Sequence, residues 1–138
     1  MVGYTLHRDL NLLATRFSGA VTDDEFIELY RTIFDDPDYV LGTNELADLR
    51  EVEDLQLSTE ALRKVEYLTR MKYGREGLSF RTALIAPSDS AFGVGRIYEV
   101  FASAGPEAVS VFRTATEAFA HLGVEPMAPE VLHGGDPA

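Results

Sequence analysis

The chain has 138 residues, of which 46% are hydrophobic, so it is the size of one ordinary domain and can bury a core without disulfides or metal ions. It contains no cysteine, which excludes disulfide frameworks, thiolate metal sites and cysteine nucleophiles. The net charge of -11 disfavours nucleic acid as a partner, because such binding depends on neutralising phosphates with Lys and Arg. Without a signal-peptide pattern or a bilayer-length apolar run, we expect a cytoplasmic protein with no stable membrane insertion.

Short apolar runs predict five strands. The expected ranges are residues 4–7, 12–17, 45–49, 81–86 and 109–112. The fourth run, Ala83-Leu84-Ile85-Ala86, is apolar throughout, which is typical of a central parallel strand buried on both faces. We expect an acidic loop between the third strand and Ser58.

Four helices are expected between and after these strands. Thr22 with Glu25 and Thr114 with Glu117 have the spacing of capping boxes for the first and fourth helices, and Ser58 suits the N-cap of the second. The third starts within Pro87-Ser88-Asp89-Ser90. Apolar residues at helical spacing give the expected inward faces: Phe26, Leu29, Tyr30, Ile33 and Phe34; Leu62, Val65 and Leu68; Val94, Ile97, Tyr98 and Phe101; Ala118, Phe119 and Leu122.

The resulting order, ββαβαβαβα, predicts a single α/β domain with a mostly parallel sheet of four or five strands covered by about four helices. The first strand is expected to be antiparallel to the second. From residue 125 the chain is rich in Pro and Gly and has no apolar period. We therefore expect a domain of residues 1–124 and a mobile or loosely docked tail of residues 125–138.

Four stretches carry a resemblance to a known family: Phe17-Ser18-Gly19-Ala20-Val21-Thr22, Ala47-Asp48-Leu49-Arg50, Phe92-Gly93-Val94-Gly95-Arg96-Ile97-Tyr98-Glu99 and Val111-Phe112-Arg113. In order and spacing they resemble the SpoIIAA-like, anti-sigma-factor-antagonist-like group of STAS-domain proteins, especially its small stand-alone bacterial members. The resemblance spans about the first 122 residues. It implies a STAS-type fold and a non-catalytic regulatory or protein-interaction role.

The resemblance also makes Ser58 a candidate phosphorylation site. Signalling members of the family carry a phosphorylated serine at the start of the second helix, within an Asp-Ser-Ser-Gly motif. This chain reads Leu57-Ser58-Thr59-Glu60 there, without the flanking Asp and Gly. Simple helix capping by Ser58 is the favoured interpretation.

Candidate residues for binding a ligand or partner lie in the loops after the third and fourth strands and on the third helix, because open α/β sheets bind ligands at the carboxyl ends of their strands. They are Asp48, Arg50, Ser58, Ser88, Ser90 and Arg96. Asp48 and Arg50 either orient a polar ligand or form a structural ion pair. Gly93 and Gly95 suit either a phosphate-binding loop or close packing of the helix on the sheet, and we favour packing.

Self-association through the third helix is also expected. Phe92 and Val100 lie outside the predicted inward face, with Arg96 between them, so these three residues form a candidate homodimer interface. The alternative is that Phe92 folds back over the helix start and Val100 is an isolated exposed residue.

No nucleophile motif, metal-binding histidine spacing or recognisable carboxylate pair is present, so we expect no catalysis, no metal site and no cofactor. The partner is expected to be a protein or a second copy of the chain. Arg63 and Arg70, on the outward face of the second helix, are expected to give weak contact with anionic lipid headgroups at most. The alternative function is a carrier or sensor of a small apolar or amphipathic ligand such as a lipid, since the chain is rich in Phe and Tyr.

Overall fold

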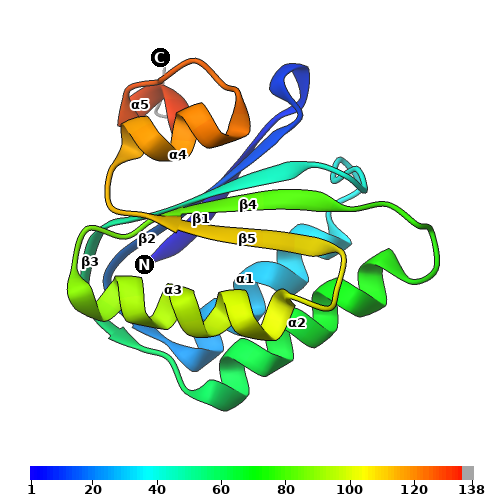
Figure 1. Ribbon diagram of the computed structural model, residues 1–138, viewed down its shortest axis with the longest axis horizontal. Helices are drawn as coiled ribbons and strands as arrows, with labels where there is room; N and C mark the ends of the chain where they lie inside the picture. The colour runs from blue at the N-terminus through cyan, green and yellow to red at the C-terminus, as the bar shows by residue number, and fades with distance from the viewer. Residues whose placement is uncertain (135–138) are drawn as a thin grey trace.

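A five-stranded sheet with helices on both faces organises the chain in the computed structural model, which describes residues 1–134 (Figure 1). The strands are β1 (Val2–His7), β2 (Leu12–Thr22), β3 (Asn44–Gln56), β4 (Phe80–Ile85) and β5 (Glu107–Phe112). The helices are the 3-10 turn η1 (Arg8–Leu10) and the α-helices α1 (Asp23–Asp35), α2 (Thr59–Tyr73), α3 (Asp89–Ala102), α4 (Ala115–Leu122) and α5 (Pro129–Leu132).

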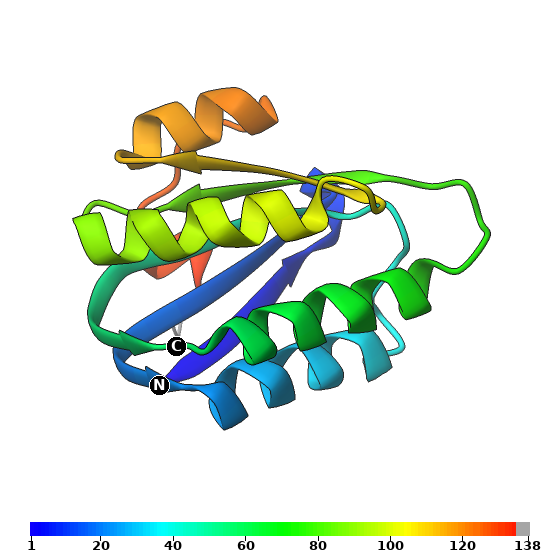
Figure 2. The same ribbon diagram turned by 60° about the horizontal axis from the view of Figure 1, so that its bottom comes forward.

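The strands follow one another across the sheet in chain order, β1-β2-β3-β4-β5. β1 is antiparallel to β2, and all later neighbours are parallel, as predicted. Helices α1, α2 and α3 cover one face, here called the α1–α3 face, and α4 and α5 cover the other, the α4–α5 face (Figures 1 and 2). Each face therefore has its own hydrophobic core.

The predicted helix starts are confirmed. Thr22 and Glu25 form a complete capping box at α1. Ser58 Oγ accepts a hydrogen bond from the Ala61 N–H at 3.1 Å, and Ser88 and Thr114 cap α3 and α4 in the same way. These bonds satisfy backbone donors that a helix cannot satisfy internally, which is why the caps locate the starts so well.

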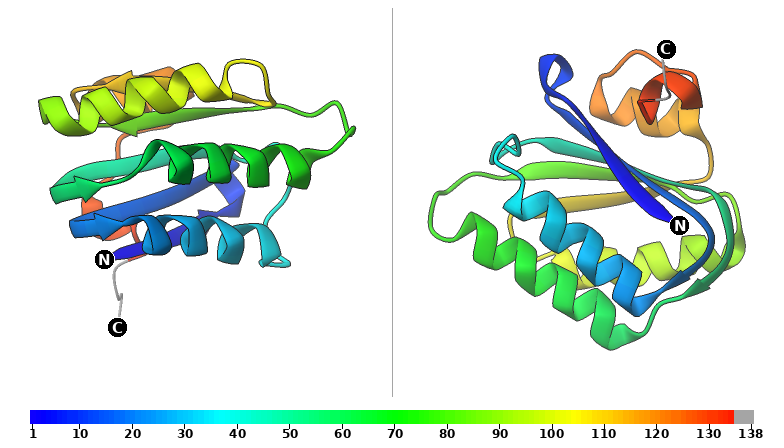
Figure 3. Two further views of the ribbon diagram at one scale, coloured as in Figure 1. Left: turned by 90° about the horizontal axis from the view of Figure 1, so that it is seen from below. Right: turned by 180° about the vertical axis from the view of Figure 1, so that it is seen from behind.

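The prediction that the third strand ends at Leu49 is wrong, because β3 continues to Gln56. Its residues 51–56 pair with residues 18–22 of β2, forming a two-stranded ribbon that extends past the end of β4 (Figure 3). Two register shifts interrupt the β2–β3 pairing, and Gly19 has a positive φ of 66° there. The expected acidic loop is therefore a strand whose charged side chains point mostly outward.

Helix α3 is rotated relative to the prediction. Ile97 was expected to point inward, but it is 45% exposed, whereas Gly95, Tyr98 and Ala102 are buried. Gly95 explains the rotation, since a Cβ at this position would lie only 3.1 Å from a Val111 methyl carbon. The glycine allows α3 to pack closely on the sheet, which confirms the packing interpretation of Gly95.

The segment after residue 124 is docked rather than loose as far as Gly134. Leu132 of α5 is fully buried and lies in the core of the α4–α5 face with Leu12, Leu46 and Phe119. The last residues of the predicted tail, 135–138, lie outside the described residues. Within residues 1–134, no helix has the length and apolar character needed to cross a membrane.

Candidate functional site

Four polar side chains form a row across the parallel strands beneath α1, α2 and α3. Thr15, Glu45, Thr82 and Glu107 come from β2, β3, β4 and β5, and each is at most 6% exposed. Glu45 and Thr82 are direct partners in the β3–β4 register, so their side chains lie on the same face. Two carboxyl groups are therefore buried in a hydrophobic core, where each needs hydrogen-bond donors.

Glu45 obtains its donors from the strand and helix that precede it. Thr15 Oγ1 donates to Glu45 Oε2 at 2.7 Å, and the Tyr30 hydroxyl donates to the same oxygen at 2.5 Å. Burial and the nearby charge of Glu107 raise the pKa of Glu45 to about 8. Glu45 therefore favours its neutral form near neutral pH.

Glu107 repeats this arrangement in the β4-α3-β5 unit. Thr82 Oγ1 donates to Glu107 Oε2 at 2.6 Å, and the Tyr98 hydroxyl donates to Oε1 at 2.9 Å. Burial raises the pKa of Glu107 and raises that of Tyr98 well above its ordinary value. The β2-α1-β3 and β4-α3-β5 units thus each contain one threonine, one tyrosine and one glutamate linked by hydrogen bonds.

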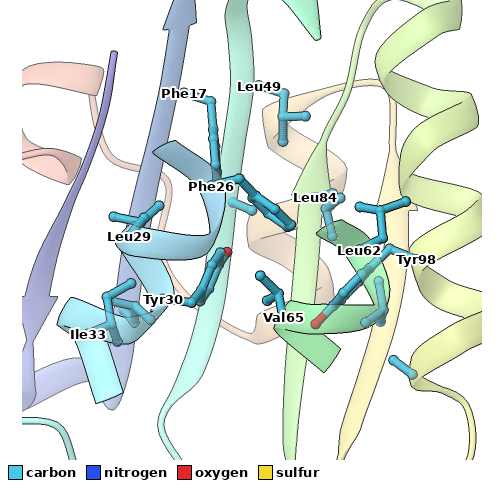
Figure 4. Packing of buried hydrophobic residues seen from close by; sticks show 14 of the residues in the cluster. Phe17, Phe26, Leu29, Tyr30, Ile33, Leu49, Leu62, Val65, Leu84 and Tyr98 are labelled. Carbon is cyan, nitrogen blue, oxygen red and sulfur yellow. The ribbon is translucent and has the colours of Figure 1, made fainter. Parts of the chain in front are cut away.

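A cavity of about 40 Å³ lies beside this row, between the sheet and the three helices. The close-up of this core shows side chains from α1, α2 and α3 pointing toward those of the strands (Figure 4). Leu55 and Leu57 are half-buried, so the mouth of the cavity lies beside them. Thr82, Tyr98 and Glu107 are buried, so the polar end of the cavity lies inside the protein. The full lining is Phe17, Phe26, Tyr30, Ala47, Leu49, Leu55, Leu57, Leu62, Thr82, Leu84, Val94, Gly95, Tyr98 and Glu107.

The α4–α5 face buries a carboxylate in a different way. Asp48 Oδ2 lies 2.7 Å from His133 Nε2, and Asp48 accepts bonds from Arg50 Nε at 2.9 Å and Arg50 Nη2 at 2.8 Å. Burial alone would raise the pKa of Asp48, but the hydrogen bonds from His133 and Arg50 outweigh it and hold the pKa well below its usual range. This ionic cluster fastens the segment after α5 to β3.

No protein-family model and no curated protein sequence matches the chain. Among solved structures, it is similar to that of an uncharacterised DUF3478-family protein from Shewanella loihica PV-4, which is described as having a SpoIIAA-like fold. The TM-score is 0.55 at 20% sequence identity, and the match covers 88% of this chain and 92% of the other. The chain has a SpoIIAA-like fold. The α/β, SpoIIAA-like architecture predicted from the sequence is confirmed.

In this SpoIIAA-like chain, Ser58 is bound by an acidic residue. The Asp23 carboxylate accepts from the Ser58 N–H at 2.8 Å and from its hydroxyl at 2.7 Å. Asp23 is the first residue of α1, so one carboxylate joins the starts of α1 and α2. A phosphate on Ser58 would lie beside this negative charge, and the arrangement favours the capping interpretation.

The candidate residues of α3 lie at the surface. Phe92 is half-buried beneath Arg113, whose guanidinium carbon lies 4.1 Å from the ring centroid, which fits the expected alternative of Phe92 folding back. Arg96 pairs with Glu99 of its own helix at 3.2 Å, and Val100 is 68% exposed. Ser90 is exposed near the helix start.

The predicted binding residues have separate hydrogen-bond partners: Asp48 and Arg50 bond to each other, and Ser58 bonds to Asp23. Among the hydrogen bonds of residues 1–134, none joins Ser58, Ser88 or Ser90 to Asp48 or Arg50. Within the same range, no group of three His, Cys, Asp or Glu residues is placed to hold a metal ion. Sequence reasoning missed Glu45, Glu107, Tyr30 and Tyr98 as a polar cluster, because only the strand register brings them together.

Proposed function

We propose that this chain is a non-catalytic regulatory module that binds a small apolar or amphipathic molecule in the cavity between the sheet and helices α1 to α3. The observation that carries the proposal is the cavity itself, which is lined mainly by apolar side chains and has a few polar groups at one end. This is the usual composition of small-molecule sites. Leu55 and Leu84 line it near the carboxyl ends of β3 and β4, the side on which open α/β sheets bind ligands.

The size of the cavity determines how a ligand enters. The closed space of about 40 Å³ is smaller than the roughly 150 Å³ that holds benzene in an engineered cavity. The empty space is about 490 Å³ when the open mouth is included. A ligand therefore occupies the mouth and displaces a helix. Helix α2 is best placed to move because it lies between α1 and α3 and packs mainly on these two helices (Figure 2).

The test is a binding titration with N-phenyl-1-naphthylamine, whose fluorescence rises in apolar sites. Leu49→Phe adds volume inside the cavity and should weaken binding at least about fivefold, which corresponds to roughly 1 kcal/mol. Leu78→Phe makes the same chemical change at a residue that is 48% exposed and outside the cavity lining, so it should leave binding unchanged. Equal binding by wild type and Leu49→Phe, or no fluorescence response at all, contradicts the proposal.

A second copy of the chain is a second candidate partner, favoured by two exposed apolar side chains on α3. Ile97 is 45% exposed and Val100 is 68% exposed. Because Phe92 is covered by Arg113, Ile97 takes its place in the proposed interface. Sedimentation equilibrium should show a dimer that Val100→Asp converts to a folded monomer. A wild-type monomer at tens of micromolar contradicts this interface.

A further inference from the structure

The polar end of the cavity contains acceptors and hydroxyl groups but no cationic side chain. Its polar lining residues are Tyr30, Thr82, Tyr98 and Glu107, and among the described residues that line it none is Lys, Arg or His. Glu45, which is bonded to Tyr30, adds a second carboxyl group directly behind this lining. The polar end of the cavity is therefore suited to a cationic group of a ligand rather than an anionic one.

An anionic head is the least compatible with this environment. A carboxylate or phosphate brought against Glu107 would lose its hydration without gaining a positive partner. Glu107, in contrast, retains the capacity to accept more hydrogen bonds. Each of its oxygens accepts one bond, from Tyr98 and from Thr82, whereas a carboxylate offers about four acceptor positions.

We propose that the cavity selects a small molecule with an apolar body and a primary-amine head, which pairs with Glu107 while the body extends toward Leu55 and Leu57 at the mouth. This inference rests on the proposed ligand-binding function and names the class of ligand. A buried ammonium-carboxylate pair adds charge-assisted hydrogen bonds, which are about twice as strong as neutral ones. The amine enters as its ammonium ion and pairs with the ionised Glu107 carboxylate, and a proton carried by the free carboxyl group is released to solvent on binding. The raised pKa of Glu107 is consistent with a carboxyl group that lacks a cationic partner.

The experiment compares three probes with the same six-carbon chain by isothermal titration calorimetry at pH 7: hexylamine, 1-hexanol and hexanoate. Hexylamine should bind at least about tenfold more tightly than hexanoate. Glu107→Gln keeps the size and hydrogen-bonding capacity of the side chain but removes its charge, so it should abolish the advantage of hexylamine and leave hexanol binding within about twofold. Glu130→Gln is the control, because it makes the same chemical change at an exposed residue of α5, on the other face of the sheet and outside this cavity lining.

Three outcomes overturn the amine assignment: hexanoate binding as tightly as hexylamine, an amine advantage that survives Glu107→Gln, or an equal loss of hexylamine and hexanol binding in that variant. Absence of hexylamine binding also overturns it. The naphthylamine titration keeps this failure distinct from that of the proposed function. If the dye binds and Leu49→Phe weakens it, only the amine assignment fails; if neither probe binds, both proposals fail.

Discussion

The two faces of the sheet bury carboxyl groups by opposite means. On the α1–α3 face, Glu45 and Glu107 receive hydrogen bonds from threonine and tyrosine hydroxyls, and burial favours their neutral forms. On the α4–α5 face, Asp48 is held by Arg50 and His133 and stays ionised. The comparison shows that the donors around a buried carboxyl group, rather than burial alone, decide its charge. One sheet therefore combines a layer in which burial raises the pKa of two glutamates with a layer in which hydrogen bonds from His133 and Arg50 lower the pKa of an aspartate.

The largest expected effect is a loss of stability with rising pH that originates on the α1–α3 face. The pKa of Glu45 is about 8 in the folded chain, against an ordinary value of 4.5. Between pH 4.5 and pH 8, the folded state therefore keeps a proton that the unfolded state has lost. Stability is full below the lower value and falls as pH rises through the higher one, by at most about 5 kcal/mol. Besides burial, the charge of Glu107 on β5 raises the pKa of Glu45, and the charge of Glu66 on α2 raises the pKa of Glu107.

Urea denaturation followed by circular dichroism between pH 5 and pH 8 measures this loss. Glu45→Gln has no titrating group at the position and should flatten the pH dependence. A wild-type midpoint that stays constant across the range would show that Glu45 is not neutral in the folded chain.

Leu132→Ala tests whether the segment after α4 belongs to the core of the α4–α5 face. Leu132 is fully buried, so its truncation should lower the free energy of unfolding by about 3 kcal/mol. Its neighbour Val131 is 59% exposed, and Val131→Ala should change stability by less than about 0.5 kcal/mol. Similar values for the two variants in thermal or urea unfolding would mean that α5 contributes nothing to this core.

The ionic cluster should make stability fall in acid, the opposite direction from Glu45. Because the pKa of Asp48 lies below its ordinary value of 3.8, its contribution is present above about pH 4 and is lost as pH falls further. Asp48→Asn should lower stability at pH 7 by about 2 kcal/mol and reduce the loss below pH 4. Asp9→Asn, at an exposed aspartate, is the control for urea unfolding at both pH values. An unchanged acid dependence in Asp48→Asn would assign that dependence to other carboxylates.

The smallest effect concerns the start of α2. Ser58→Ala removes the cap and the hydroxyl bond to Asp23, and should cost about 1 kcal/mol in urea unfolding. Ser90→Ala lies one residue inside the start of α3 without a capping bond and should be close to neutral. Equal costs for the two serines would indicate that Ser58 is no more than an ordinary surface residue.

Features that depend on neighbouring residues in the sequence could be predicted. The caps at Thr22, Ser58, Ser88 and Thr114 follow from short spacings, and periodicity placed every strand of the sheet and helices α1 to α4. The rotation of α3 could not be predicted, because it depends on how closely Gly95 approaches Val111 of β5.

The candidate site was harder to predict for the same reason. Glu45 is the first residue of a predicted strand and Glu107 lies just before another, so the sequence predicts that each is an exposed charged residue. Only the register of β3, β4 and β5 shows that both are buried. A weak signal exists, since each glutamate follows a tyrosine on the preceding helix and a threonine on the preceding strand. His133 gave no such signal, because its partner Asp48 is 85 positions away.

The ribbon formed by residues 18–22 and 51–56 has a mechanical consequence. β2 leads directly into α1, β3 leads through Leu57 and Ser58 into α2, and Asp23 ties the two helix starts together (Figure 3). Both helices are therefore attached to the same ribbon, whereas α3 is attached to the sheet separately. Leu55 of the ribbon and Leu57 directly after it line the cavity mouth, whereas Val94 across the mouth belongs to α3, so bending of the ribbon would carry the start of α2 away from α3 and widen the mouth.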